Sequence, residues 1–127
     1  MKSFFASRIA SFRYAFQGWH HVFRTQQNMW IHGVIATVVF FLALWLRLRA
    51  HDWAMLVLTT AMVFAAEFMN TAIEAVVDLA SPDKHPLAKI GKDVGAAAVL
   101  VAALAAILIG LLILGPPLWF KLISLFS

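Results

Sequence analysis

Cysteine is absent from this 127-residue chain, and charged residues make up only 13% of it. The absence of cysteine excludes a disulfide framework, a thiolate metal site and a thiol nucleophile. Hydrophobic residues account for 63% of the sequence, whereas an ordinary soluble domain has about a quarter charged and under half apolar residues. A soluble globule is therefore not expected, and a disordered chain is excluded. We expect a small bundle of membrane helices that forms a single domain over residues 1–127.

The chain carries a net charge of +4 at pH 7. No polar basic face is long enough to follow a nucleic-acid duplex, so no nucleic-acid partner is expected. The cations instead fit membrane interfaces and a phosphate site.

The N-terminal segment has the pattern of an amphipathic helix over about residues 4–24. Its apolar residues recur at gaps of three and four and form one stripe, which comprises Phe5, Ile9, Phe12, Phe16, Trp19 and Phe23. Basic and polar residues lie off this stripe. Such a helix is expected to lie in the membrane surface.

Three segments are apolar and long enough to cross a membrane, at about residues 29–48, 53–80 and 92–115. Residues 81–93 are expected to form a polar connection in which Pro82 and Pro86 interrupt the helix. The third span is expected to end near Pro116-Pro117, followed by a short interfacial tail. Seven of the ten Lys and Arg residues lie in the N-terminal segment and in the connection over residues 81–93. This bias places the N-terminus in the cytoplasm.

Small residues recur every three or four positions in the third span, at Gly91, Gly95, Ala98, Ala102, Ala106 and Gly110. Such a row lets membrane helices approach closely. Because three spans enclose little interior, an oligomer is expected.

The second span carries Glu67, Asn70, Glu74 and Asp78 within an arc of roughly 80° on one helix face. One ionised carboxylate at the centre of a membrane helix costs about 2.5–3.5 kcal/mol, so this face must look onto protein, water or a cation. Measured from Trp53, Glu67 is expected about 21 Å deep and well inside the hydrocarbon, with Glu74 near the cytoplasmic boundary.

Carboxylate and amide oxygens of this kind suit Mg²⁺ that also binds water and phosphates. Cationic residues follow two helical turns later, namely Lys84, His85, Lys89 and Lys92, with Asp93 beside them. This combination is typical of phosphoryl transfer. No P-loop or glycine-rich nucleotide motif is present.

Two runs, Glu67–Asp78 and His85–Leu100, resemble the signature of the prokaryotic diacylglycerol kinase family. The N-terminal pattern, which includes Thr25, Asn28 and His32, is more similar to the undecaprenol kinase branch. The resemblance covers about residues 8–114. It implies an all-α integral membrane protein with a surface helix and three spans, assembled as a homotrimer in the bacterial inner membrane. It also implies ATP with Mg²⁺ as phosphoryl donor and a lipid alcohol as acceptor, undecaprenol in preference to diacylglycerol.

The resemblance also implies roles for individual residues. Glu67 would be the general base that takes the proton of the lipid hydroxyl, and Glu74 would ligate Mg²⁺. The nucleotide would be surrounded by Asn70, Glu74, Asp78, His85, Lys92 and Asp93, with Tyr14 near the adenine. Gln26 stands where the family usually has a second Mg²⁺-binding glutamate. An amide oxygen can coordinate a cation but adds no charge, so Mg²⁺ affinity should fall.

Other interpretations remain open from the residues alone. The acidic stripe could line the cation path of a small oligomeric channel, although the nearby lysines would repel cations at its mouth. Gln26 also allows an inactive kinase relative with a structural role. Glu67 could be a protonated carboxyl that bonds a neighbouring helix, and Tyr14 could be an interfacial anchor. His32 is expected to hydrogen-bond another helix or the edge of the site.

Overall fold

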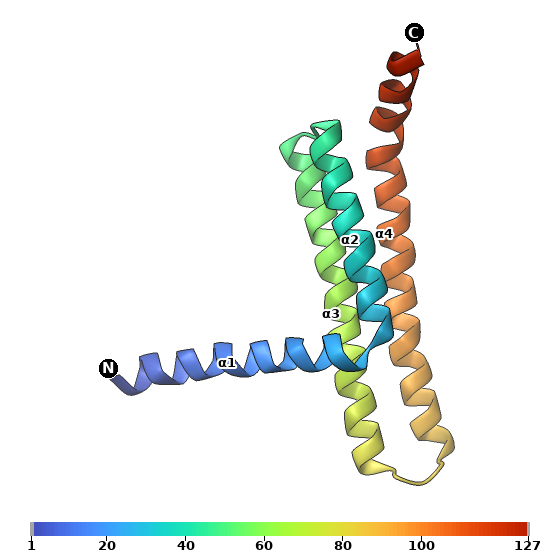
Figure 1. The fold of residues 1–127 in the computed structure, drawn as a ribbon. Helices are drawn as coiled ribbons and strands as arrows, with labels where there is room; N and C mark the ends of the chain where they lie inside the picture. Colours follow the sequence, from blue (N-terminus) through green and yellow to red (C-terminus); the bar gives the residue numbers. More distant parts are fainter. Residues whose placement is uncertain (1, 127) are drawn as a thin grey trace.

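The computed structural model describes the backbone of residues 2–126 and the side chains of residues 8–125. The described chain folds into four helices (Figure 1), α1 (Lys2–Thr25), α2 (Gln27–Leu46), α3 (Ala50–Ala80) and α4 (Pro86–Phe126). Helices α2, α3 and α4 run side by side, and α1 extends sideways away from them. Three helical segments are long and apolar enough to cross a membrane, Gln27–Leu46, Ala50–Ala80 and Pro86–Leu125. The predicted all-α membrane architecture is confirmed.

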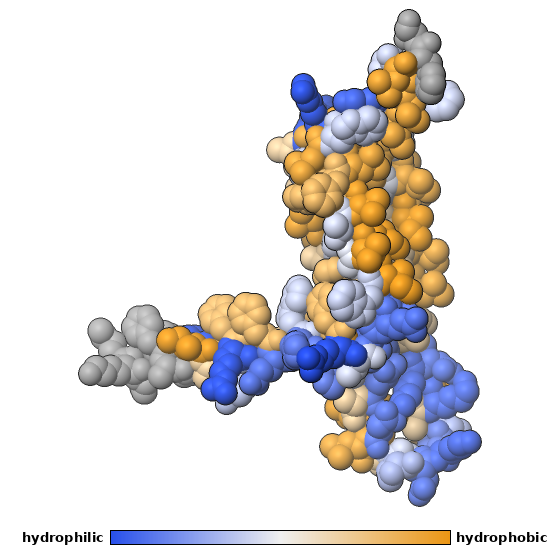
Figure 2. Space-filling model, viewed as in Figure 1, coloured by the Kyte–Doolittle hydropathy of each residue, from blue (hydrophilic) through white to orange (hydrophobic). Residues whose placement is uncertain are grey.

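Helix α1 presents its apolar side toward the apolar band of the bundle and its basic side away from it (Figure 2). Trp19 stacks on Phe23 and also packs against two rings of α3, with centroid distances of 6.4 Å to Phe64 and 5.1 Å to Phe68. These aromatic contacts fix where α1 meets the bundle. The side chain of Phe5, the first member of the predicted stripe, lies outside the described part of the chain.

The turn between α2 and α3 depends on Arg47, which adopts a left-handed conformation with φ 56°. This conformation lets the backbone N–H groups of Arg47 and Leu48 donate to the carbonyls of Leu44 and Ala43, which closes the end of α2. The buried cluster of Ala43, Leu56 and Leu114 then packs three helices together near this end of the bundle.

Helices α3 and α4 form an antiparallel hairpin whose connection is shorter than predicted. The polar segment expected over residues 81–93 is non-helical only at residues 81–85, because Pro86 begins α4 instead of interrupting it. Proline is favoured at a first helical position, where its missing N–H costs no hydrogen bond. Lys89, Lys92 and Asp93 therefore lie on helix α4, with fixed spacing along its first two turns.

The expected helix end at Pro116-Pro117 is wrong, because α4 continues through both prolines to Phe126. The two prolines deprive the carbonyls of Leu112 and Ile113 of their usual donors. Beyond this point α4 contacts the end of α2. Lys121 donates from Nζ to the carbonyl of Trp45 at 3.1 Å, and its ammonium group lies 4.9 Å from the centroid of the Trp45 ring.

Candidate active site

Three members of the predicted stripe turn inward together. Glu67 is 1% exposed, Asn70 is buried, and Glu74 is half-buried. The close approach of α4 creates this environment, because a Cβ placed on Gly95 would overlap Asn70 Oδ1. Gly91, one turn earlier, would tolerate a Cβ, since the nearest atom is Val77 Cγ2 at 3.6 Å.

Glu67 borders a cavity of about 260 Å³ between α2, α3 and α4, which we call the Glu67 cavity. Its polar lining consists of Asn28, His32, Glu67 and Asn70, and its apolar lining of Ile31, Ala96, Val99, Leu100 and Ala103. Within the described chain, Glu67 Oε1 and Asn70 Oδ1 are buried without a hydrogen-bond partner. Buried acceptors of this kind are costly unless a donor reaches them. The cavity is therefore suited to a ligand with a hydroxyl group.

Helix α1 meets α3 at the level of Glu67, because Trp19 packs against Phe64 and Phe68 on either side of it in sequence. A helix in the membrane surface lies at the boundary between headgroups and acyl chains. The position of α1 in the membrane surface and the depth of Glu67 counted from Trp53 both stay predictions, and the structure shows that α1 crosses α3 at the level of Glu67.

Glu74 is held by two amides. Its Oε1 accepts from Asn70 Nδ2 at 3.2 Å, and its Oε2 accepts from Gln26 Nε2 at 3.4 Å. Gln26 reaches this carboxylate from the corner between α1 and α2. It is the residue just before α2, and its backbone is extended. The structure therefore brings together the two residues that the sequence predicted as metal ligands.

The remaining stripe residue, Asp78, is 64% exposed at its side chain and forms an ion pair with Lys92 of α4. Lys89 and Asp93 pair on the outer face of α4. His85 caps the start of α4, because its Nδ1 accepts the backbone N–H of Leu87 at 3.2 Å. These residues line an open depression of about 540 Å³ at the end of the α3–α4 hairpin. Its exposed charges suit a water-soluble anionic ligand.

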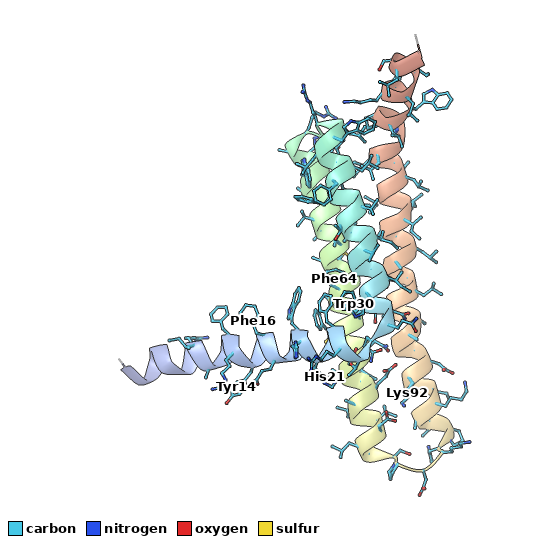
Figure 3. All side chains as sticks on the ribbon, in the orientation of Figure 1. Tyr14, Phe16, His21, Trp30, Phe64 and Lys92 are labelled. Carbon is cyan, nitrogen blue, oxygen red and sulfur yellow. The ribbon has the colours of Figure 1, made fainter. Side chains whose placement is uncertain are left out.

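Tyr14 does not join this group. It lies 66% exposed on a part of α1 that extends away from the α3–α4 hairpin, far from Lys92 (Figure 3). His32 was expected to hydrogen-bond another helix or the edge of the site, and its Nε2 lies 3.2 Å from Glu67 Oε1 on α3. An ionisable residue inside a membrane helix usually has a partner, and this rule could have pointed to the pair.

The oxygen donors around Glu74 fit Mg²⁺. No cluster of three or more His, Cys, Asp or Glu residues suited to a metal occurs in the described chain. The Glu74 carboxylate instead has the amides of Gln26 and Asn70 beside it. Mg²⁺ commonly binds one or two carboxylates and completes its shell with waters and substrate phosphates. The Gln26 and Asn70 amides can turn their oxygens toward such a cation, since each carries both donor and acceptor ends.

A sequence model of the family described as "Prokaryotic diacylglycerol kinase" matches residues 13–114. The chain belongs to the prokaryotic diacylglycerol kinase family. Three members of this family illustrate its range. The diacylglycerol kinase of Synechocystis sp. is 46% identical over 111 residues, which cover 87% of this chain and 63% of the relative. The undecaprenol kinase of Bacillus subtilis is 39% identical over 108 residues, covering 85% and 88%. The diacylglycerol kinase of Escherichia coli (strain K12) is 37% identical over 76 residues, covering 60% and 62%.

The chain thus spans less than two thirds of the length of the Synechocystis relative and most of the Bacillus one. Both runs that predicted the prokaryotic diacylglycerol kinase family, Glu67–Asp78 and His85–Leu100, lie inside the matched range.

Proposed function

We propose that this protein is a membrane lipid kinase that transfers the γ-phosphoryl group of ATP to a lipid hydroxyl at the membrane surface. The observation that carries the proposal is the position of Glu67. Its carboxylate is buried beside a largely apolar cavity, while the same helix continues to Glu74 and the exposed Asp78. A lipid alcohol at the interface and a water-soluble donor can therefore meet along one helix face. The names of the relatives, diacylglycerol kinase and undecaprenol kinase, support this assignment.

Glu67 would act as the general base. Its Oε1 lines the Glu67 cavity and accepts no hydrogen bond from any described residue, so it is available to accept the proton of a lipid hydroxyl. A positioned base of this kind contributes about 10²- to 10⁴-fold to a rate. Asn70, one turn along α3, has a second free acceptor in the same cavity. It would help to orient the hydroxyl and the γ-phosphate between Glu67 and Glu74.

The nucleotide would occupy the charged depression at the hairpin end, surrounded by Asp78, His85, Lys92 and Asp93. Lys92 would exchange its ion pair with Asp78 for the phosphates and offset the charge that develops there. Glu74 and Gln26 would hold Mg²⁺, which would neutralise phosphate charge when bound. Because Gln26 is uncharged, binding of the cation would depend more on Glu74 and the phosphates.

Undecaprenol is the proposed acceptor, with diacylglycerol as the alternative. The N-terminal pattern with Thr25, Asn28 and His32 favours the first. The Lys and Arg bias of the flanking segments supports a bacterial inner-membrane protein with a cytoplasmic N-terminus.

A homotrimer would complete the site. Tyr14 lies far from Lys92 within one copy (Figure 3), so it would approach the adenine only from another copy. Most large apolar side chains of the three long helices are exposed in the single chain, and neighbouring copies or lipid would cover them.

The test is a transfer assay in vesicles with purified protein, radiolabelled ATP and Mg²⁺, in which undecaprenol and diacylglycerol are presented separately. We expect label in the lipid phase with at least one alcohol and a higher kcat/KM for undecaprenol. Label in neither lipid would overturn the kinase proposal. Cation flux through the same vesicles without nucleotide would favour the channel.

A further inference from the structure

His32 and Glu67 come from different helices and meet inside the bundle. His32 lies on α2 with a side chain that is 19% exposed, and Glu67 lies on α3 with a side chain that is 2% exposed. The distance from His32 Nε2 to Glu67 Oε1 is 3.2 Å. Both side chains line the Glu67 cavity.

No other titratable residue among those described lines the cavity around this pair. The facing surface of α4 contributes Ala96, Val99, Leu100 and Ala103, and α1 meets this level of α3 through the Trp19 ring. Asn70 directs its amide N–H to Glu74 and not to Glu67. The imidazole is thus the one group at the cavity that can offset the charge of the Glu67 carboxylate.

The orientation of the contact leaves Glu67 free to react. His32 Nε2 lies within ion-pair distance of Oε1, which has no hydrogen-bond partner in the described chain. His32 therefore contacts the carboxylate without occupying the lone pair that would accept the substrate proton.

We propose that His32 is a positioning residue for Glu67, which holds the buried carboxylate in place and directed into the Glu67 cavity. This inference rests on the proposed lipid kinase activity with Glu67 as base. A carboxylate that accepts a proton from a substrate must be held in one orientation, and His32 Nε2 of α2 is placed to hold it. A residue that acts in this way affects turnover more than the binding of either substrate.

The test compares His32→Leu and His32→Gln with the unmodified protein in the vesicle transfer assay. We expect His32→Leu to lower kcat about tenfold or more with KM for ATP and lipid within about twofold. His32→Gln should recover most of this loss, because its amide N–H can reach the position of Nε2. His51→Leu is the matched control. It removes a second histidine–carboxylate contact, 2.9 Å to Asp52 at the other end of α3, and should leave kcat unchanged.

A double-mutant cycle separates positioning from a structural role. If His32 acts through Glu67, His32→Leu should cause no further loss in the E67Q background. An equal fractional loss in both backgrounds, or no rescue by His32→Gln, would overturn the inference. Should His32→Leu fail to assemble, His32→Asn replaces it, because its shorter amide cannot reach Glu67. If the unmodified protein labels no lipid, the proposed function fails; if it is active and His32→Leu matches it, only the role of His32 fails.

Discussion

Gln26 Nε2 lies 3.4 Å from Glu74 Oε2, although 48 residues separate them in the chain. The contact joins the corner between α1 and α2 to the polar half of α3. Because Gln26 directly follows α1, the position of α1 determines whether the Gln26 amide reaches Glu74. The proposed cation site therefore depends on the docking of α1 through Trp19 as well as on α3 itself.

Gln26→Glu should strengthen Mg²⁺ binding. A second carboxylate beside Glu74 adds charge to a site that now has one, and Mg²⁺ affinity rises with ligand charge. We expect the Mg²⁺ concentration for half-maximal activity to fall about threefold to tenfold, measured by Mg²⁺ titration at fixed ATP. Gln27→Glu adds the same charge at an adjacent exposed residue and should change little. A higher Mg²⁺ requirement in Gln26→Glu would contradict the assignment of this site.

Gly95→Ala should impair catalysis more than stability. The new Cβ would overlap Asn70 Oδ1, and the Asn70 side chain would have to turn away from Glu74. Because one side chain can move without separating the helices, we expect kcat to fall about tenfold or more while the melting temperature changes by only a few degrees.

Gly91→Ala is the control for this substitution, since its Cβ meets only an ordinary contact with Val77 Cγ2 at 3.6 Å. It should retain activity. Equal losses of kcat in the two variants would indicate that any added volume between α3 and α4 impairs the protein. Displacement of Asn70 would then not explain the effect of Gly95→Ala.

The sequence predicted the acidic stripe correctly as one face of a helix, because a period of 3.6 residues aligns Glu67, Asn70 and Glu74. The sequence also placed Asp78 beyond Glu74 toward the cytoplasm. In the structure Asp78 is exposed at the end of α3 that extends past α1 (Figure 1). Its pairing with Lys92 was not predicted, because it depends on how α4 packs against α3.

The helix ends of α4 were the least predictable feature. Pro86 and Pro116 carry the same local signal, yet neither interrupts the helix. The first occupies a favoured starting position, and the second is followed by the Lys121 contacts with Trp45. For His32 and Glu67 the sequence predicted contacts with another helix, but it did not identify the two as partners, because that depends on how α2 packs against α3.

Lys92→Gln should weaken ATP binding. Lys92 lies on the wall of the charged depression, where it now pairs with Asp78. Loss of its charge should raise KM for ATP about tenfold, with a smaller fall in kcat, since a phosphate contact made before and during transfer contributes to both. Initial rates against ATP concentration give this value.

Lys121→Gln provides the comparison, because it removes the same charge at the opposite end of α4. Its KM for ATP should match that of the unmodified protein. If Lys121→Gln raised KM for ATP as much as Lys92→Gln, the effect would reflect overall charge and not a nucleotide site at the hairpin.

The most direct test of the central claim is the transfer of phosphate from ATP to lipid by Glu67→Gln. Glutamine keeps the size of the buried side chain but cannot accept the hydroxyl proton as a carboxylate does. We predict that kcat falls by about 10²- to 10⁴-fold while ATP binding, followed in parallel with a fluorescent nucleotide, stays within about twofold. Full activity in Glu67→Gln, in protein that remains folded and binds ATP, would contradict the account.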